Sequence, residues 1–288
     1  MPMTWLLHRD KLTLAWKYPA RGSIWRLLSS ERGTLILEER DLAAKELRLT
    51  SIDADAGTIV WSTDRFRNRW WLSIETLHGN ILFLHEYATP DMPDHKKVIA
   101  LNLLDGAQVW SNEEMKFLFA HGQSVYVSRD TYDGRTFHEL DVATGEVLRE
   151  VDDATIGALR PAGESSTGIQ FPVALTEGGN DAQEASAAIR SVVGTRPVAG
   201  GVEYIDADGR WLIGWHERIT PDDPSSPLRH RFTIVDKAKQ SVLYQDDIDA
   251  SVKVPIPDLF IRRNDMVYYI KDKNSLCAVR LATARRDR

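Results

Sequence analysis

Cysteine is almost absent from this sequence, since Cys277 is the only one in 288 residues. A single cysteine excludes an intramolecular disulfide, a thiolate metal cluster and a paired redox motif, and it favours a reducing compartment. The sequence also has no apolar run near the roughly 18 residues that a membrane-spanning helix requires. Residues 1–18 lack the charged and apolar pattern of an export signal. We therefore expect a cytoplasmic protein that makes no membrane contact.

The sequence has no excess of positive charge. Its 36 Lys and Arg residues are outnumbered by 42 Asp and Glu residues, which gives a formal net charge of −6. Nucleic-acid binding depends on neutralising phosphates, so the charge balance disfavours that function. A Gly-rich phosphate loop, a nucleophile elbow and a zinc-spaced His pair are also missing. We predict no nucleic-acid partner, no cofactor, no metal and no catalytic residue.

What the sequence does contain is a repeated hairpin. Residues 49–62, 98–111 and 136–150 each read as an alternating strand, a polar turn that ends in Gly, and a second short strand. Asp or Asn opens each turn, Gly follows four residues later, and Trp follows four residues after the Gly in the first two copies. Self-similarity at a fixed spacing is the signature of a fold built from one repeated unit. The matching positions are Asp53, Gly57 and Trp61; Asn102, Gly106 and Trp110; and Asp141 and Gly145.

The hairpin is half of a larger unit, because two apolar strands joined by a tight turn precede it. We predict an all-β fold: a single β-propeller domain over residues 1–288 with six four-stranded blades, or seven as the alternative. An orphan strand at residues 12–18 is predicted to join the last blade and close the ring, which would leave no exposed ladder edge. The predicted blades cover residues 23–63, 70–113, 116–152, 157–200, 201–246 and 256–288.

The hairpin resembles the propeller repeat of the quinoprotein alcohol dehydrogenase family, the PQQ-like repeat, and that of a related non-enzymatic outer-membrane assembly scaffold. The resemblance rests on the Asp–Gly–Trp spacing at Asp53, Gly57 and Trp61 and on its weaker copies. It implies a β-propeller in which Asp and Gly form the turn while Trp packs between blades. We carry over this fold, but no cofactor, and expect a non-enzymatic member.

Two Asp-rich turns could be taken for calcium loops. They begin at Asp53 and Asp206, each followed by a second Asp two residues later. A calcium loop also requires a third carboxylate and a bidentate Glu about twelve residues from its start, and both are missing. Ordinary hairpin turns are the favoured interpretation.

Each predicted second strand ends in an acid. In a propeller, these strand ends would surround the mouth of the central channel with carboxylates and two imidazoles. Such a ring could bind a cation or a basic partner, or could catalyse acid–base chemistry. Alternatively, each acid accepts hydrogen bonds from backbone donors, a role that its repetition in every blade favours. The pairs are Glu38-Glu39, His85-Glu86, Arg129-Asp130, Thr176-Glu177, His216-Glu217 and Lys271-Asp272. The binding candidates among them are His85, Glu86, Arg129, Asp130, His216 and Glu217.

The segment from residue 63 to residue 71 adds Arg67 and Trp70 to the candidates. Its three arginines alternate with aromatic residues, a pattern that suits an anion-binding or cation–π patch. The same pattern also suits aromatic packing between blades, with the arginines paired to acidic loops.

We predict a non-catalytic binding or scaffolding module with an unidentified protein or small-molecule ligand. Its binding face would carry the long loops at residues 87–97, 178–186 and 218–230. The alternative is a propeller enzyme, a hydrolase or lyase, with a metal or His/Glu site at the channel mouth. Both remain open, because propellers host enzymes as well as scaffolds.

Overall fold

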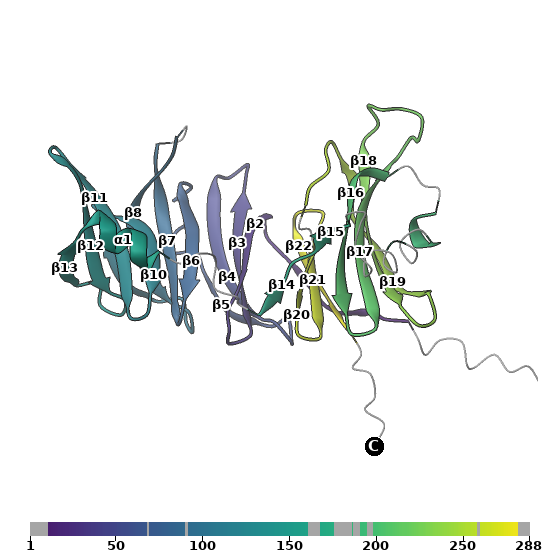
Figure 1. Ribbon diagram of the computed structural model, residues 1–288, viewed down its shortest axis with the longest axis horizontal. Helices are drawn as coiled ribbons and strands as arrows, with labels where there is room; N and C mark the ends of the chain where they lie inside the picture. Colours follow the sequence, from purple (N-terminus) through teal and green to yellow (C-terminus); the bar gives the residue numbers. More distant parts are fainter. Residues whose placement is uncertain are drawn as a thin grey trace, which may run out of the picture. The chain divides into compact units, whose positions relative to one another are not determined.

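The computed structural model divides into two compact units, each described here by itself. Unit 1 comprises Met1–Ala20 and Gly168–Arg288, and unit 2 comprises Arg21–Thr167. The structure describes residues 11–67, 69–89, 92–160, 168–175, 186, 191–194, 198–257 and 260–281. These residues form an all-β fold with little helix, as predicted, and the labelled strands can be followed in Figure 1.

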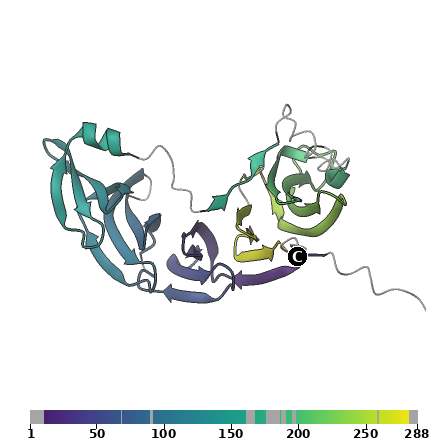
Figure 2. The ribbon, with the colours of Figure 1, turned by 60° about the horizontal axis from the view of Figure 1, so that its bottom comes forward.

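Unit 2 contains three antiparallel sheets of four strands, each in sequential order. The sheets stand side by side in both Figure 1 and Figure 2. The first sheet is β2 (Ser23–Ser29), β3 (Thr34–Asp41), β4 (Glu46–Asp53) and β5 (Ile59–Thr63). The second is β6 (Leu72–His78), β7 (Ile81–Thr89), β8 (Met92–Asn102) and β9 (Gln108–Asn112). The third is β10 (Lys116–His121), β11 (Ser124–Thr131), β12 (Gly134–Asp141) and β13 (Val147–Val151).

Unit 1 contains two antiparallel sheets of five strands. One has the order β15 (Val173–Ala174), β16 (Val198–Ala207), β17 (Arg210–Arg218), β18 (Leu228–Asp236) and β19 (Ser241–Val252). The other has the order β1 (Leu14–Pro19), β22 (Ser275–Arg280), β21 (Met266–Lys271), β20 (Phe260–Arg263) and β14 (Ile169–Gln170). A shared apolar core that includes Phe232, Phe260 and Tyr269 joins the two sheets.

The repeated turn forms as the sequence predicts. Asp53 accepts hydrogen bonds through Oδ1 from the backbone N–H groups of Asp55 (3.0 Å) and Ala56 (2.7 Å). Gly57 then takes a left-handed conformation, with φ of 71°. Since glycine adopts this conformation without a steric penalty, it ends the turn and starts the next strand. The Asp53 carboxylate is therefore a turn residue, as the hairpin interpretation requires.

Tryptophan links each of the first two sheets of unit 2 to the next. The Trp61 ring lies against Gly106, where an added Cβ would be 2.7 Å from the ring, and Trp110 lies in the same way against Gly145, at 2.5 Å. Each indole N–H donates to a backbone carbonyl of the next sheet, Trp61 to Leu103 (2.7 Å) and Trp110 to Val142 (3.0 Å). The Trp and Gly of the repeat thus act across sheets as well as within a hairpin.

The N-terminal strand completes the last sheet. Strand β1 pairs antiparallel with β22, with Leu14 opposite Val279 and Lys17 opposite Cys277. This is the strand that the sequence leaves without neighbours, and its pairing covers an edge that would otherwise be free.

Residues 153–200 depart from the repeat. Helix α1 (Asp153–Leu159) is capped at its N-terminus by Asp152, whose side chain accepts a hydrogen bond from the Thr155 N–H. The short strands β14 and β15 then extend the two neighbouring sheets of unit 1. In the part of the chain that the structure describes, these residues form no sheet of their own. The six-blade count and the single-domain ring accordingly stay predictions. Among the described residues, no helix has the length and apolar character needed to cross a membrane.

Candidate functional site

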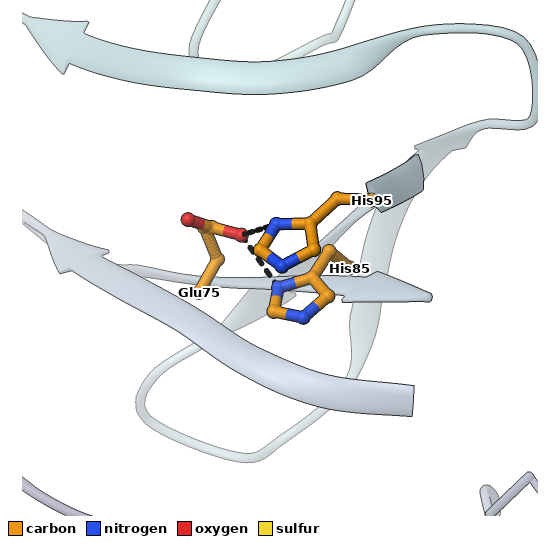
Figure 3. A group of neighbouring side chains, drawn as sticks. All are labelled: Glu75, His85 and His95. Atoms are coloured by element: carbon orange, nitrogen blue, oxygen red, sulfur yellow. Dashed lines mark ion pairs between the residues drawn. The ribbon is translucent and has the colours of Figure 1, made fainter. Parts of the chain in front are cut away.

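Two histidines and a glutamate meet in the second sheet of unit 2 (Figure 3). His85 on β7 and His95 on β8 stack with ring centroids 3.6 Å apart and an interplanar angle of 7°. Both Nδ1 atoms face the same carboxylate oxygen, Glu75 Oε2, at 2.5 Å from His85 and 3.2 Å from His95. Tyr87 packs edge-on against both rings. His85 is fully buried, while Glu75 and His95 are half-buried.

Two irregularities in strand pairing bring these side chains together. The pairing of β6 with β7 shifts between Ile74 and Thr76, so Glu75 is a bulge residue. The pairing of β7 with β8 shifts at Lys97, which has φ of 62° and leaves His95 opposite Tyr87. Bulges redirect side chains relative to a regular ladder, and the second one places His95 on the His85 face of the sheet.

The pKa values of Glu75 and His95 are both lowered in this cluster. Burial alone would raise the pKa of Glu75, but the close approach of His85 and the charges of His85, His95 and Arg26 lower it below its usual value. The pKa of His95 is lowered by burial first and by the charge of His85 second, against the opposing effect of Glu75. Glu75 is therefore ionised and His95 neutral near pH 7.

Unit 1 contains a second stacked histidine pair. His216 on β17 and His230 on β18 are direct cross-strand partners, with ring centroids 4.4 Å apart. His216 Nε2 accepts a hydrogen bond from the Ile256 N–H at 3.3 Å. Burial lowers the pKa of His216, and burial together with the charge of His216 lowers the pKa of His230 to about 3. Both rings are therefore neutral at pH 7, and each is packed inside the sheet.

The acids at the end of β3 hold neighbouring strands together. Glu38 is fully buried and accepts hydrogen bonds from Arg40 Nε (2.6 Å), Ser73 Oγ (2.8 Å) and the Ile74 N–H (2.8 Å). Glu39 accepts from the Arg21 N–H at 2.9 Å. In the first sheet, then, the repeated acids have the structural role that the sequence favours.

Trp70 belongs to the same network. Its ring lies over the Arg40 guanidinium (5.0 Å) and the Lys45 ammonium (4.6 Å), and its carbonyl accepts from Arg40 at 2.6 Å. Trp70 thus has cation–π contacts, but with Arg40 and Lys45. Arg67 and Arg69 pair with Glu46 and Glu86, as the alternative interpretation expects.

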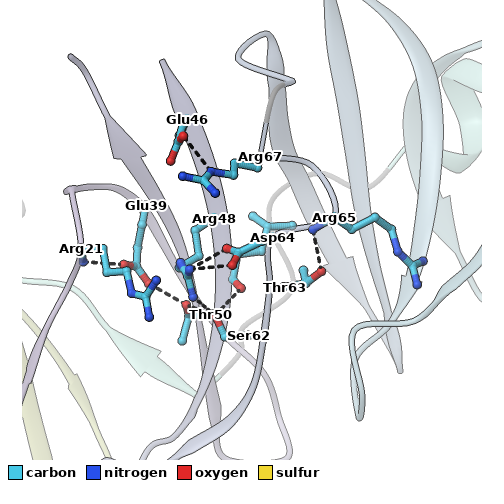
Figure 4. Close-up of polar contacts among 11 residues, drawn as sticks. Arg21, Glu39, Glu46, Arg48, Thr50, Ser62, Thr63, Asp64, Arg65 and Arg67 are labelled. Carbon is cyan, nitrogen blue, oxygen red and sulfur yellow. Dashed lines mark hydrogen bonds and ion pairs between the residues drawn. The ribbon is translucent and has the colours of Figure 1, made fainter. Parts of the chain in front are cut away.

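A cavity of about 290 Å³ opens at the strand ends of the first sheet (Figure 4). Arg67, with its Nε 2.7 Å from Glu46 Oε1, lies at one side, and Arg48 bridges to Asp64 at 2.6 Å. Charged side chains of both signs make up most of the lining. The lining residues are Arg21, Gly22, Glu39, Asp41, Glu46, Leu47, Arg48, Asp64 and Arg67.

The remaining predicted residues form local ion pairs. Glu86 accepts from Arg69 at 2.8 Å, and Glu217 accepts from Arg231 at 3.0 Å. Arg129 pairs with Glu114, while Asp130 pairs with Lys116 (2.7 Å) and Arg135 (2.9 Å). Each of the eight candidates makes these contacts within its own unit, and a site that unites them stays a prediction. Predicted residues Thr176 and Glu177, and most of the 178–186 loop, lie outside the described residues.

A family model described as a domain of unknown function, DUF4905, matches residues 28–110. This match covers strands β3 to β5 of the first sheet of unit 2 and nearly all of the second sheet. A search of the curated proteins gives no match.

Several solved structures show a distant likeness. BamB from Moraxella catarrhalis is 10% identical with a TM-score of 0.35, covering 93% of this chain and 88% of that chain. Quinohemoprotein alcohol dehydrogenase from Comamonas testosteroni is 12% identical with a TM-score of 0.33, covering 92% of this chain and 44% of that chain. The Cps50 (Swd1) β-propeller domain of Myceliophteria thermophila is 11% identical with a TM-score of 0.32, covering 89% of this chain and 68% of that chain.

Sequence reasoning identified His85 but missed Glu75 and His95. The three residues are ten positions apart, a spacing that matches neither strand alternation nor a known ligand motif. Only the bulges at Glu75 and Lys97 place them on one face. Glu75 is an acid on the first strand of its sheet, where the bulge positions of the neighbouring sheets hold Trp25 and Leu118, and this contrast is a signal that could have pointed to it.

Proposed function

We propose that this chain is a non-catalytic β-propeller binding module whose binding surface includes the cavity beside Arg67. Four-stranded repeats, tryptophan packing between successive sheets and the completion of the last sheet by β1 support a propeller closed by its N-terminal strand. A six-bladed ring is the finer form of this proposal.

The lining of the cavity carries the functional part of the proposal. Three guanidinium groups and four carboxylates line it. The Arg67–Glu46 pair lies at the surface, with side chains 59% and 31% exposed, and surface pairs contribute on the order of 1 kcal/mol or less. A charged partner can replace such a pair at little cost, so the cavity suits binding of a protein segment or small ligand that carries both charges.

Two of the predicted long loops are shorter in the structure. Most of residues 87–97 is strand, because β7 runs to Thr89 and β8 begins at Met92. In unit 1, the loop between β17 and β18 covers residues 219–227 of the predicted 218–230, and hydrogen bonds stabilise it, from Arg218 to the Pro224 carbonyl (2.7 Å) and from the Thr220 N–H to Ser226 Oγ (2.8 Å). An ordered loop loses less conformational entropy on binding than a disordered one, which favours recognition.

The test compares two matched charge reversals. Arg67→Glu changes a residue at the cavity, and Arg149→Glu changes an equally exposed residue that lies outside it. Both arginines bond a Glu through Nε at 2.7 Å, and their side chains are 59% and 63% exposed. Cross-linking and affinity capture from native cells should recover the same partners with wild type and Arg149→Glu, but at least tenfold less with Arg67→Glu. Equal recovery by both variants would contradict the proposed surface.

The Glu75, His85 and His95 cluster is the observation that favours the alternative, a hydrolase or lyase. His95 is partly accessible, so a substrate could approach the imidazole. A screen of ester, lactone and glycoside substrates with wild type and His95→Ala tests it. Turnover by the wild type that is abolished in His95→Ala would contradict the non-catalytic proposal and favour an enzyme.

A further inference from the structure

We propose that Glu75, His85 and His95 bind one divalent transition-metal ion, with Zn²⁺ as the best-matched candidate. The proposal does not depend on the cavity beside Arg67 or on a bound partner. It adds a metal where the sequence predicts none.

The donor set has the composition of known metal sites. Each residue offers one ligand atom, and these atoms all lie within 4.8 Å of one another. Two imidazoles and one carboxylate are the ligands of several zinc and non-haem iron centres, and three protein ligands leave a coordination position open. Ligands at about 2.0–2.1 Å from a tetrahedral Zn²⁺ lie about 3.3 Å apart. The present separations of 2.5 and 3.2 Å from Glu75 Oε2 are within 1 Å of this value, and the two stacked imidazole rings would have to turn out of their parallel arrangement to direct both Nδ1 lone pairs at one ion.

Unsatisfied polar atoms at the centre of the cluster provide independent support. Both ring nitrogens of fully buried His85, and Glu75 Oε2, lack a hydrogen bond of acceptable geometry. His85 Nδ1 lies 2.5 Å from this oxygen, so without a metal the two atoms contact each other directly. Leaving a buried polar atom unsatisfied costs on the order of tenfold or more in a folding equilibrium. A metal ion would satisfy the Nδ1 and Oε2 atoms together.

Metal binding requires an ionised carboxylate and an imidazole with a free nitrogen, forms that Glu and His side chains ordinarily take near neutral pH. The positive charge of Arg26 opposes binding of a metal cation, and its guanidinium donates a hydrogen bond to the Ile74 carbonyl at 2.8 Å.

The second histidine pair shows what Glu75 contributes. His216 and His230 also stack, but in the described part of the chain only the Glu75 cluster brings three potential ligands together. We therefore expect one metal site in this part of the chain, in unit 2.

The test titrates the full chain, stripped with EDTA, with Zn²⁺ by calorimetry and with Co²⁺ by visible absorption. We expect saturation at one equivalent and ligand-field bands with Co²⁺. Glu75→Gln and His95→Ala change half-buried residues and should each weaken Zn²⁺ binding at least about 100-fold, since loss of even an outer-shell partner costs 10- to 100-fold. His121→Ala, an exposed histidine in the same unit, should bind as wild type does.

The outcomes separate metal binding from simple packing. Circular dichroism and thermal unfolding establish that each variant is folded, and Glu75→Gln serves alone if His95→Ala does not fold. Wild type without saturable binding, or a folded Glu75→Gln variant that binds Zn²⁺ like wild type, would overturn the site. Loss of Zn²⁺ binding with unchanged partner capture would leave the proposed binding surface intact.

Discussion

At the scale of single residues, Gly106 and Gly145 do two things at once. Each ends its own turn in a left-handed conformation, with φ of 70° and 72°, and each provides the flat surface on which the preceding sheet's tryptophan lies. The sequence shows the first role through its turn spacing. The second depends on a partner more than 30 residues away, Trp61 or Trp110.

Gly106→Ala should lower the free energy of unfolding by about 2–4 kcal/mol. Its Cβ would lie 2.7 Å from the Trp61 ring, so overpacking adds about 1–3 kcal/mol to the conformational penalty. Gly79→Ala is the matched control, because Gly79 has φ of 56° with nothing within 4 Å of the added Cβ. The control should lose only about 1 kcal/mol, the left-handed penalty alone. Urea denaturation measures both, and equal losses would contradict packing of Trp61 on Gly106.

Within strands, His230 on β18 makes stability depend on pH. Its folded pKa of about 3 lies below the unfolded value of 6.5, so the unfolded state binds more protons between these limits. Stability from this group is therefore complete above pH 6.5 and declines as the pH falls toward 3. Going from pH 7 to pH 5 should cost about 2 kcal/mol, from about 1.4 kcal/mol per pKa unit. Lowering of the His216 pKa acts in the same direction.

His230→Gln removes the titrating ring and should abolish most of that difference. Urea unfolding of wild type and variant at pH 7 and pH 5 provides the comparison. Because the readout is the difference between two pH values, a general loss of stability in the variant does not affect it. A variant that keeps the full wild-type difference would show that His230 is not the group responsible.

The strands also show where sequence prediction ends. The Asp–Gly–Trp spacing predicted the hairpins that end at Trp61 and Trp110, because turn chemistry is local. Prediction of the Glu75, His85 and His95 site would have required the register of strand pairing. The bulges at Glu75 and Lys97 change which side chains share a face without altering the apolar alternation. Residues 157–200 carry weak repeat signals, and their described strands β14 and β15 join neighbouring sheets, an assignment set by tertiary pairing.

At the scale of the whole molecule, the two ends of the chain build one unit. Strand β1 covers β22, which contains Cys277, the only cysteine of the chain. Cys277 is buried in the core of unit 1, and burial raises the pKa of its thiol. Since the thiolate is the reactive form, this cysteine is protected twice, by exclusion of reagent and by protonation.

A chain that begins at Ala20 should lose this protection. Without β1 the edge of β22 is open, so unit 1 opens more often and Cys277 should react with a disulfide reagent at least tenfold faster than in the full chain. Absorbance of the released thiol follows the reaction, and the urea-unfolded chain gives the fully accessible rate. Identical rates for the two folded chains would mean that β1 does not stabilise unit 1.

The pairing of β1 with β22 also sets an order of events during synthesis. Leu14 leaves the ribosome early, but its partner Val279 is made 265 residues later. At roughly 5–20 residues per second, the first strand waits about 13–53 s for a partner. The three sheets of unit 2 contain only sequential pairings and can form during that interval. Translation speed and cellular chaperones therefore influence the yield of unit 1 far more than that of unit 2.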